Sequence, residues 1–166
     1  TTLIGTLFIT ILNSILWFFG IHGTAVIDSF MGPLWYAARF ANFDMFQASV
    51  TAARQYIVTQ DFANHIIFLG GTGNTVSLAA IMAFKCRSKR IKSLGKLSLL
   101  PGIFNVNEPV IFGLPMVLNP MMALPFFIVP PVTVLISFCA MYFGLVPYPT
   151  GVTVPWTLPA PFGGWM

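Results

Sequence analysis

Charge is what this sequence lacks most. Only 7% of its 166 residues are charged, 57% are hydrophobic, and the mean hydropathy is +0.84. A soluble domain carries roughly 25% charged residues because its surface faces water. Eight Lys and Arg with four Asp and Glu cannot cover a globule in water, so a soluble enzyme, a disordered tail and a nucleic-acid-binding module are poor interpretations. A membrane-embedded chain is the favoured class.

Cysteine is scarce as well, with only two residues of this type. Cys86 and Cys139 are separated by 52 residues, which fits neither a CxxC pair nor a metal site, so we expect two reduced thiols. A positively charged leader is missing before the first apolar run, so we do not expect a signal peptide. The start at Thr1 without a methionine predicts that the chain is a piece of a longer polypeptide.

Positive charge is confined to one segment, residues 85–96. The segment holds six of the eight Lys and Arg, and without these six the net charge would fall from +4 to −2. Short loops rich in Lys and Arg stay on the cytoplasmic side of a membrane, so we expect a cytoplasmic basic loop that orients the chain. A contact of this loop with phosphate or anionic lipid is an alternative that is compatible with that role.

Two uncharged apolar runs are long enough to predict transmembrane helices. Residues 3–21 would reach ~28 Å as a helix, close to the roughly 30 Å of a bilayer core. Residues 121–146 form the second run, which we expect to be bent by its prolines. Apolar character continues from the first run to residue 41, so the first helix must bend near His22.

The other connections are polar or irregular. Residues 42–64 carry Asp44, Arg54 and Asp61 among scattered apolar positions, which predicts an interfacial connection with a short helix. The tail, residues 147–166, is rich in proline and glycine and predicts irregular structure.

Two apolar segments are interrupted, one on each side of the basic loop. Residues 65–84 contain GGTGN at their centre, and residues 97–120 contain four prolines and several polar residues. Broken helices at membrane depth must face protein or a polar cavity, and a pair of them indicates a transporter's binding site. The sequence therefore predicts an all-α membrane protein with transmembrane helices and two broken or re-entrant hairpin segments. The alternative is a plain helical bundle in which the glycines serve close packing.

Glu108 is the only glutamate of the chain and lies between apolar runs, beside Asn105 and Asn107. A carboxylate at membrane depth costs roughly 3 kcal/mol or more, so it must face a polar cavity or a partner. Counted as helix from Lys96, Glu108 would lie ~18 Å deep, near the bilayer midplane. A carboxylate flanked by two amides suits several hydroxyls of a neutral polyol. The alternative is a structural carboxylate that caps backbone amides at the helix break.

His22 is the second candidate for a binding residue. Gly20 and Gly23 give the backbone around it more conformational freedom. Gly23 is included among the predicted site residues. An imidazole offers one donor and one acceptor to a hydroxyl, and Trp17 nearby would stack on the apolar face of a sugar ring. Trp156 is either a second stacking surface or an interfacial belt residue. A lone histidine at a helix end is otherwise a structural or interfacial residue.

The GGTGN sequence at residues 70–74 lacks the GxxxxGK[ST] pattern of a nucleotide site, and we expect no cofactor. We interpret it as a hairpin tip that lends Thr72, Asn74 or backbone groups to a polar ligand. His65, at the start of the same segment, is interpreted as a helix-terminus or interface residue.

The sequence PGIFNVNEPVIFGLPMVLNP, residues 101–120, closely resembles the signature of a bacterial sugar permease family. This family is enzyme IIC of the lactose/cellobiose type in the phosphoenolpyruvate-dependent phosphotransferase system. FGIHG around His22, GGTGN, and VPWTLPAP around Trp156 fit the same family in the same order. The resemblance covers nearly the whole chain, and NEPVIFG is its most specific part.

The resemblance implies a multi-pass transporter of the bacterial inner membrane. It would bind a disaccharide of the cellobiose, chitobiose or lactose class and pass it inward for phosphorylation by a cytosolic enzyme IIB. Enzyme IIA would supply enzyme IIB with the phosphoryl group. It also implies that His22 and Glu108 bind substrate hydroxyls, with Asn107, Trp17 and Trp156 at the sugar. In the family an amino-terminal half forms a homodimer interface, and that half is not in this chain.

The resemblance further implies that a phosphoryl carrier on another chain supplies the energy, so this chain is not catalytic alone. Glu108 could have a further role near the hydroxyl to be phosphorylated, positioning it or accepting its proton.

Three other functional classes fit the residues less well. An ion- or proton-coupled secondary transporter of a polar solute would use Glu108 and His22 for coupling, although coupling usually needs more than one acidic group. An intramembrane enzyme would need a Ser/His/Asp set, an HExxH motif or paired acids at membrane depth, and none is present. A purely structural subunit does not explain why polar residues collect in two broken segments.

Overall fold

The structure is a computed structural model that describes residues 2–48, 56–159 and 162. Within these ranges all regular structure is helical and no strand is present, which confirms the all-helical prediction. The elements follow one another as α1 (Leu3–Phe18), α2 (Gly23–Gln47), α3 (Gln60–Phe62), the π-helix η1 (Ala63–Ile67), α4 (Val76–Lys85), α5 (Lys89–Ile103), α6 (Glu108–Gly113) and α7 (Pro120–Tyr142).

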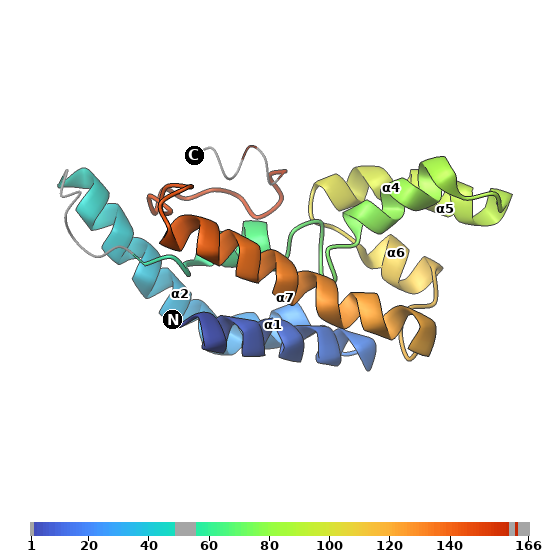
Figure 1. Cartoon of the computed structure of the whole chain (residues 1–166), viewed down its shortest axis with the longest axis horizontal. Coiled ribbons are helices and arrows are strands. Elements are labelled where there is room, and N and C mark those ends of the chain that lie inside the picture. Colours follow the sequence, from blue (N-terminus) through green and yellow to red (C-terminus); the bar gives the residue numbers. More distant parts are fainter. Residues whose placement is uncertain (1, 49–55, 160–161, 163–166) are drawn as a thin grey trace.

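The helices form a long layer with a hairpin at one end (Figure 1). α1 and α7 lie side by side and run in opposite directions, and α2 returns beside α1. The α4–α5 hairpin projects at the end of the molecule where α1 stops, and α6 leads from it to the start of α7. The irregular tail then runs back above α7.

α1 has a polarity opposite to that of a helix in a soluble protein. Its buried side includes Thr6, Thr10 and Ser14, whose hydroxyls donate to the carbonyls four residues earlier at 2.7–3.2 Å. Its exposed side carries large apolar residues such as Ile4 and Phe8. Small polar side chains let membrane helices pack closely, and large apolar ones face lipid well, so α1 fits a helix in a bilayer.

Within the described residues, α7 is the one helix long and apolar enough to cross a membrane by itself. α1 is shorter than the expected span over residues 3–21, because the chain turns after Phe18. Gly20 has a φ of +81°, and the N–H of Ile21 donates to the carbonyl of Leu16 at 2.9 Å. This left-handed glycine ends the helix and aims the chain toward His22.

Two connections differ in part from the bounds expected from the sequence. Residues 42–64 were expected to be an interfacial connection with a short helix; α2 continues into this range as far as Gln47, and a short helix, α3, is present at Gln60–Phe62. Residues 49–55 lie outside the described residues. Part of the reason is that the buried Asn42 accepts from the N–H of Tyr56 and donates to its carbonyl, both at 2.8 Å, so this turn of α2 is fixed by protein contacts.

The basic segment 85–96 is also mostly helical rather than a loop. Only residues 86–88 connect α4 to α5, and Lys89 already opens α5. Lys, Arg and Leu are good helix formers, which favours this early start. A Cβ at Gly95 would meet the backbone of Ala83, so glycine there lets α5 lie directly against α4.

Two apolar clusters frame the centre of the molecule. The larger joins α2, α3, η1 and α7 around Trp35, Phe62 and Val134. The smaller joins α1, α4, α6 and α7 around Trp17, Ile111 and Phe126.

Candidate functional site

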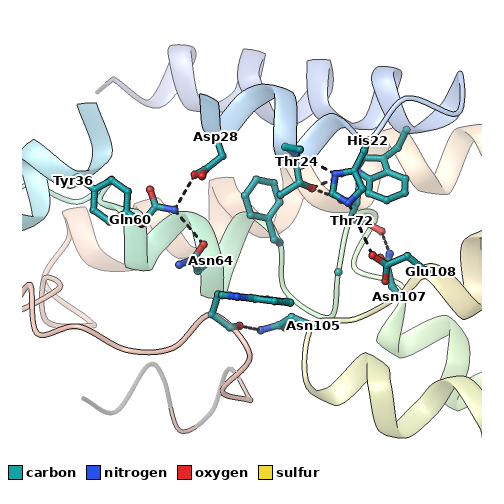
Figure 2. Close-up of a pocket in the computed structure, with 15 residues that line it drawn as sticks. His22, Thr24, Asp28, Tyr36, Gln60, Asn64, Thr72, Asn105, Asn107 and Glu108 are labelled. Atoms are coloured by element: carbon teal, nitrogen blue, oxygen red, sulfur yellow. Dashed lines mark hydrogen bonds and ion pairs between the residues drawn. The ribbon is translucent and has the colours of Figure 1, made fainter. Parts of the chain in front are cut away.

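A cavity of about 370 Å³ opens where the broken segments meet. Its walls come from the α1–α2 turn, α2, η1, the glycine loop, the turn before α6, and the tail (Figure 2). Ligand pockets for small molecules generally measure about 300–1,000 Å³. The sequence-predicted residues that line it are Trp17, His22, Thr72, Asn105, Asn107, Glu108 and Trp156.

His22 and Glu108 face each other across one end of the cavity. The distance from His22 Nε2 to Glu108 Oε1 is 4.0 Å, and their side chains are 56% and 44% exposed. This separation is too long for a hydrogen bond, so a hydroxyl could lie between them and contact both. The second oxygen of Glu108, Oε2, is buried and has no hydrogen-bond partner in the described part of the chain.

His22 also begins α2. Its Nδ1 accepts from the backbone N–H of Ala25 at 3.2 Å, which caps the helix. Because Nδ1 is an acceptor, the neutral ring carries its proton on Nε2. The Nε2–H is therefore the donor that points toward Glu108 and the cavity.

Trp17 lies against His22, with ring centroids 4.4 Å apart. Its indole Nε1 donates to Thr24 Oγ1 at 3.2 Å, and that hydroxyl is 3.1 Å from the hydroxyl of Thr72. Asn13 also donates to Thr72, at 3.3 Å. The network joins α1, α2 and the glycine loop, and it fixes the indole that forms one aromatic wall.

Asn107 holds the glycine loop against the start of α6. Its side-chain amide donates to the carbonyl of Thr72 at 2.6 Å and to Thr75 Oγ1 at 2.9 Å. This close approach depends on Gly71, which has a φ of +80° and lies where a Cβ would collide with the Asn107 side chain. The loop therefore needs glycine at this position for both its backbone angle and its space.

We expect Gly71→Ala to destabilise the protein by about 2–5 kcal/mol, from left-handed strain of ~1–2 and overpacking of ~1–3. Gly144→Ala is the matched control, since Gly144 also has a positive φ (+73°) but has open space around it. Only the strain of about 1–2 kcal/mol is expected there. Thermal unfolding of the two variants in detergent tests this, and equal losses would contradict the role given to the Asn107 contact.

Asn105 joins two other walls of the cavity. Its Oδ1 accepts from the N–H of Gly70 at 2.9 Å, and its Nδ2 donates to the carbonyl of Trp156 at 2.6 Å. Trp156 lines the cavity from the tail. Asn105 thus ties the tail that carries Trp156 to the glycine loop.

Two residues of the predicted site do not line the cavity. Gly23 is buried beside Asn13, and a Cβ there would collide with its backbone and side-chain oxygens, so Gly23 serves the packing of α1 on α2. The side chain of Asn74 donates to Thr133 Oγ1 on α7 at 2.9 Å. Neither is among the residues that line the cavity.

Several lining residues were not predicted from the sequence, namely Thr24, Ala25, Asp28, Tyr36, Gln60, Asn64, Phe68 and Gly71. A helical pattern could have found some of them. Thr24, Asp28, Gly32 and Tyr36 follow each other every four residues on α2, which places them along one side of the helix. Gln60 and Asn64 are likewise four residues apart.

The chain matches the family "Phosphotransferase system, EIIC" over residues 1–130. It is 44% identical over 162 residues to the lichenan permease IIC component of Bacillus subtilis (strain 168), a match that covers 98% of this chain and 35% of the relative. It is 36% identical to the lactose-specific EIICB component of Staphylococcus aureus, covering 90% of this chain and 26% of the relative.

A solved structure is similar along nearly the whole chain. The crystal structure of the transporter ChbC, the IIC component from the N,N'-diacetylchitobiose-specific phosphotransferase system, matches with a TM-score of 0.94 and 41% identity. The match covers 99% of this chain and 38% of that one. The chain thus spans about a third of the length of the proteins that it resembles.

Proposed function

Because the chain belongs to the EIIC family of the phosphotransferase system, a family of membrane sugar permeases, we propose that it forms the sugar-binding part of such a permease. In this proposal it binds a disaccharide of the cellobiose, chitobiose or lactose class in the cavity. It then passes the sugar inward across the bacterial inner membrane for phosphorylation by enzyme IIB. Residues 85–96 lie on the cytoplasmic side, and several segments cross the membrane.

The observation that carries this proposal is the pair of His22 and Glu108 at the cavity. A hydroxyl between them would accept from His22 Nε2–H and donate to Glu108 Oε1 across the 4.0 Å gap. A second hydroxyl would satisfy the buried Oε2 of Glu108, which has no partner among the described residues. Trp17 and Trp156 offer aromatic faces for a sugar ring.

In this proposal the bound sugar is then phosphorylated. A sugar hydroxyl attacks the phosphoryl group on enzyme IIB, the new bond forms between that oxygen and phosphorus, and the bond from phosphorus to the carrier breaks. The hydroxyl proton must leave, and Glu108 positions the hydroxyl or accepts its proton. The charged product is then disfavoured beside a carboxylate, which makes uptake one-way.

The partners in this proposal are enzyme IIB and, through it, enzyme IIA. Neither cysteine of the chain lines the cavity: Cys86 lies between α4 and α5, and Cys139 lies in α7. In the proposal the phosphoryl carrier belongs to enzyme IIB. The EIICB name of the lactose-specific relative is consistent with close coupling of the two components. A homodimer through the family's amino-terminal half, and contact with lipid, complete the proposed assembly.

A panel of sugars tests the proposed function. We expect disaccharides to raise the thermal unfolding temperature of the detergent-solubilised protein, because a ligand that binds only the folded state stabilises it. Uptake in cells should need the phosphoryl donor and should survive a protonophore. Uptake that needs no phosphoryl donor and collapses with the protonophore would contradict the proposal and favour an ion- or proton-coupled transporter.

A further inference from the structure

A second, smaller cavity of about 130 Å³ adjoins the α3–η1 segment. Gln60 and Asn64 of this segment line the first cavity (Figure 2), whereas Asp61 and His65, each one position further along the chain, line the second. The remaining walls of the second cavity come from the end of α7 and from the tail. One short helical segment therefore separates the proposed sugar site from a cavity that no part of the proposed function uses.

The part of the tail that covers the second cavity, residues 146–156, is here called the strap. It is fixed to α2 where Asn42 Nδ2 donates to the carbonyl of Pro149 at 2.8 Å. At Gly151, with a φ of +81°, a Cβ would collide with the backbone of α2, so the strap lies directly on that helix. Its far end carries Trp156, whose carbonyl accepts from Asn105. The strap thus covers the second cavity and then supplies an aromatic wall of the first.

His65 lies in the second cavity as a buried titratable group without a partner. Its side chain is only 3% exposed, and neither Nδ1 nor Nε2 has a hydrogen-bond partner among the described residues. A neutral imidazole brings one donor and one acceptor, whereas an imidazolium brings two donors and a charge. An unpaired buried polar group is costly and an unpaired buried charge is far more so. The closed strap therefore tolerates the neutral ring and opposes the protonated one.

Three other ionisable groups accompany His65. Asp61 lines the same cavity, and the positive charge of Arg39 on α2 and the N–H of Val154 in the strap both attract its carboxylate. Tyr148 lines the cavity from the strap, and α7 adds no ionisable group to the described lining. As long as Asp61 and Arg39 are both charged they balance each other, so a proton on His65 adds a net positive charge to the group.

We propose that His65 is a proton-binding site that controls the strap and, through Trp156, the affinity of the first cavity. Neutral His65 lets the strap close. A proton from solvent on the second ring nitrogen requires hydration of the imidazolium, so the strap opens and Trp156 leaves the first cavity. Sugar binds the closed state, so sugar and proton compete and sugar binding releases protons. The change falls within roughly pH 5–7, where histidine titrates.

The link to sugar rests on the proposed function and is tested by titration calorimetry with a disaccharide at about pH 7.5 and about pH 5.5, on either side of the range in which histidine titrates. We expect the affinity of the detergent-solubilised native protein to fall about tenfold at the lower pH. His65→Gln, which keeps a polar side chain but cannot titrate, should lose less than about twofold. His22 and Glu108 are present in both proteins, so their own titration cancels. Equal falls in the two proteins would overturn the inference.

Hydrogen exchange of the native protein tests the strap without any sugar. After correction for the intrinsic effect of pH on exchange, protection of the strap amides should be lower at about pH 5.5 than at about pH 7.5. The amides around the buried Val134 of α7 are the internal control and should keep their protection. Unchanged protection of the strap would overturn the inference even if His65→Gln failed to fold. If no sugar bound at either pH, the proposed function would fail, while hydrogen exchange would still decide the role of His65.

Discussion

Replacing Glu108 by glutamine is expected to weaken disaccharide binding about 100-fold or more while leaving the fold intact. Glutamine has nearly the same shape, but it removes the charge and turns one acceptor into a donor. Oε1 faces His22 and Oε2 is buried without a partner, so both oxygens are available to hydroxyls. A hydrogen bond to a charged group contributes about 1.5–3 kcal/mol, and two of them correspond to the stated loss.

Titration calorimetry with a disaccharide measures this loss in the detergent-solubilised protein. Asp44→Asn serves as the control, because it also neutralises a carboxylate but at an exposed position outside the cavity. If the Glu108→Gln variant kept native affinity, Glu108 would be a structural carboxylate at the helix break and the site would have to lie elsewhere.

His22→Ala is expected to have two separate effects, because His22 both caps α2 and faces the ligand. Loss of the bond from Ala25 N–H to Nδ1 should lower the free energy of unfolding by about 0.5–2 kcal/mol. Loss of the Nε2–H donor and of the ring beside Trp17 should weaken disaccharide binding about 30-fold.

His22→Asn separates the two effects. Asparagine is a good helix cap, so it should restore most of the stability, but its short side chain does not replace the imidazole Nε2–H beside Glu108. We therefore expect near-native thermal unfolding together with weak binding. Recovery of binding along with stability would mean that His22 acts only through the start of α2.

The residues that could be predicted were those whose type is rare in an apolar chain. Glu108 stood out as the only glutamate, and His22 as a histidine beside a helix end. Polar and ionisable side chains are costly in a lipid environment, so both residues were expected to face a polar cavity. The expectation that they share one site also used the family motifs, because no spacing rule brings residues so far apart in the chain together.

The parts that could not be predicted depend on tertiary packing. Gln60 and Asn64 lie in a region interpreted as an interfacial connection, because its charges suggested contact with the membrane surface. Asp28 was not chosen because the chain around it is ordinary apolar helix. Gly23 and Asn74 were placed in the site by their neighbours in sequence, yet one serves helix packing and the other bonds to α7.

The bonds of Asn105 have a consequence for binding energetics. They tie the irregular tail at Trp156 to the glycine loop through protein groups alone. The tail therefore loses its conformational entropy when the protein folds. Sugar binding does not require a second loss. The second aromatic wall is preorganised, so the affinity of the cavity reflects its contacts with the ring and not the ordering of a mobile segment.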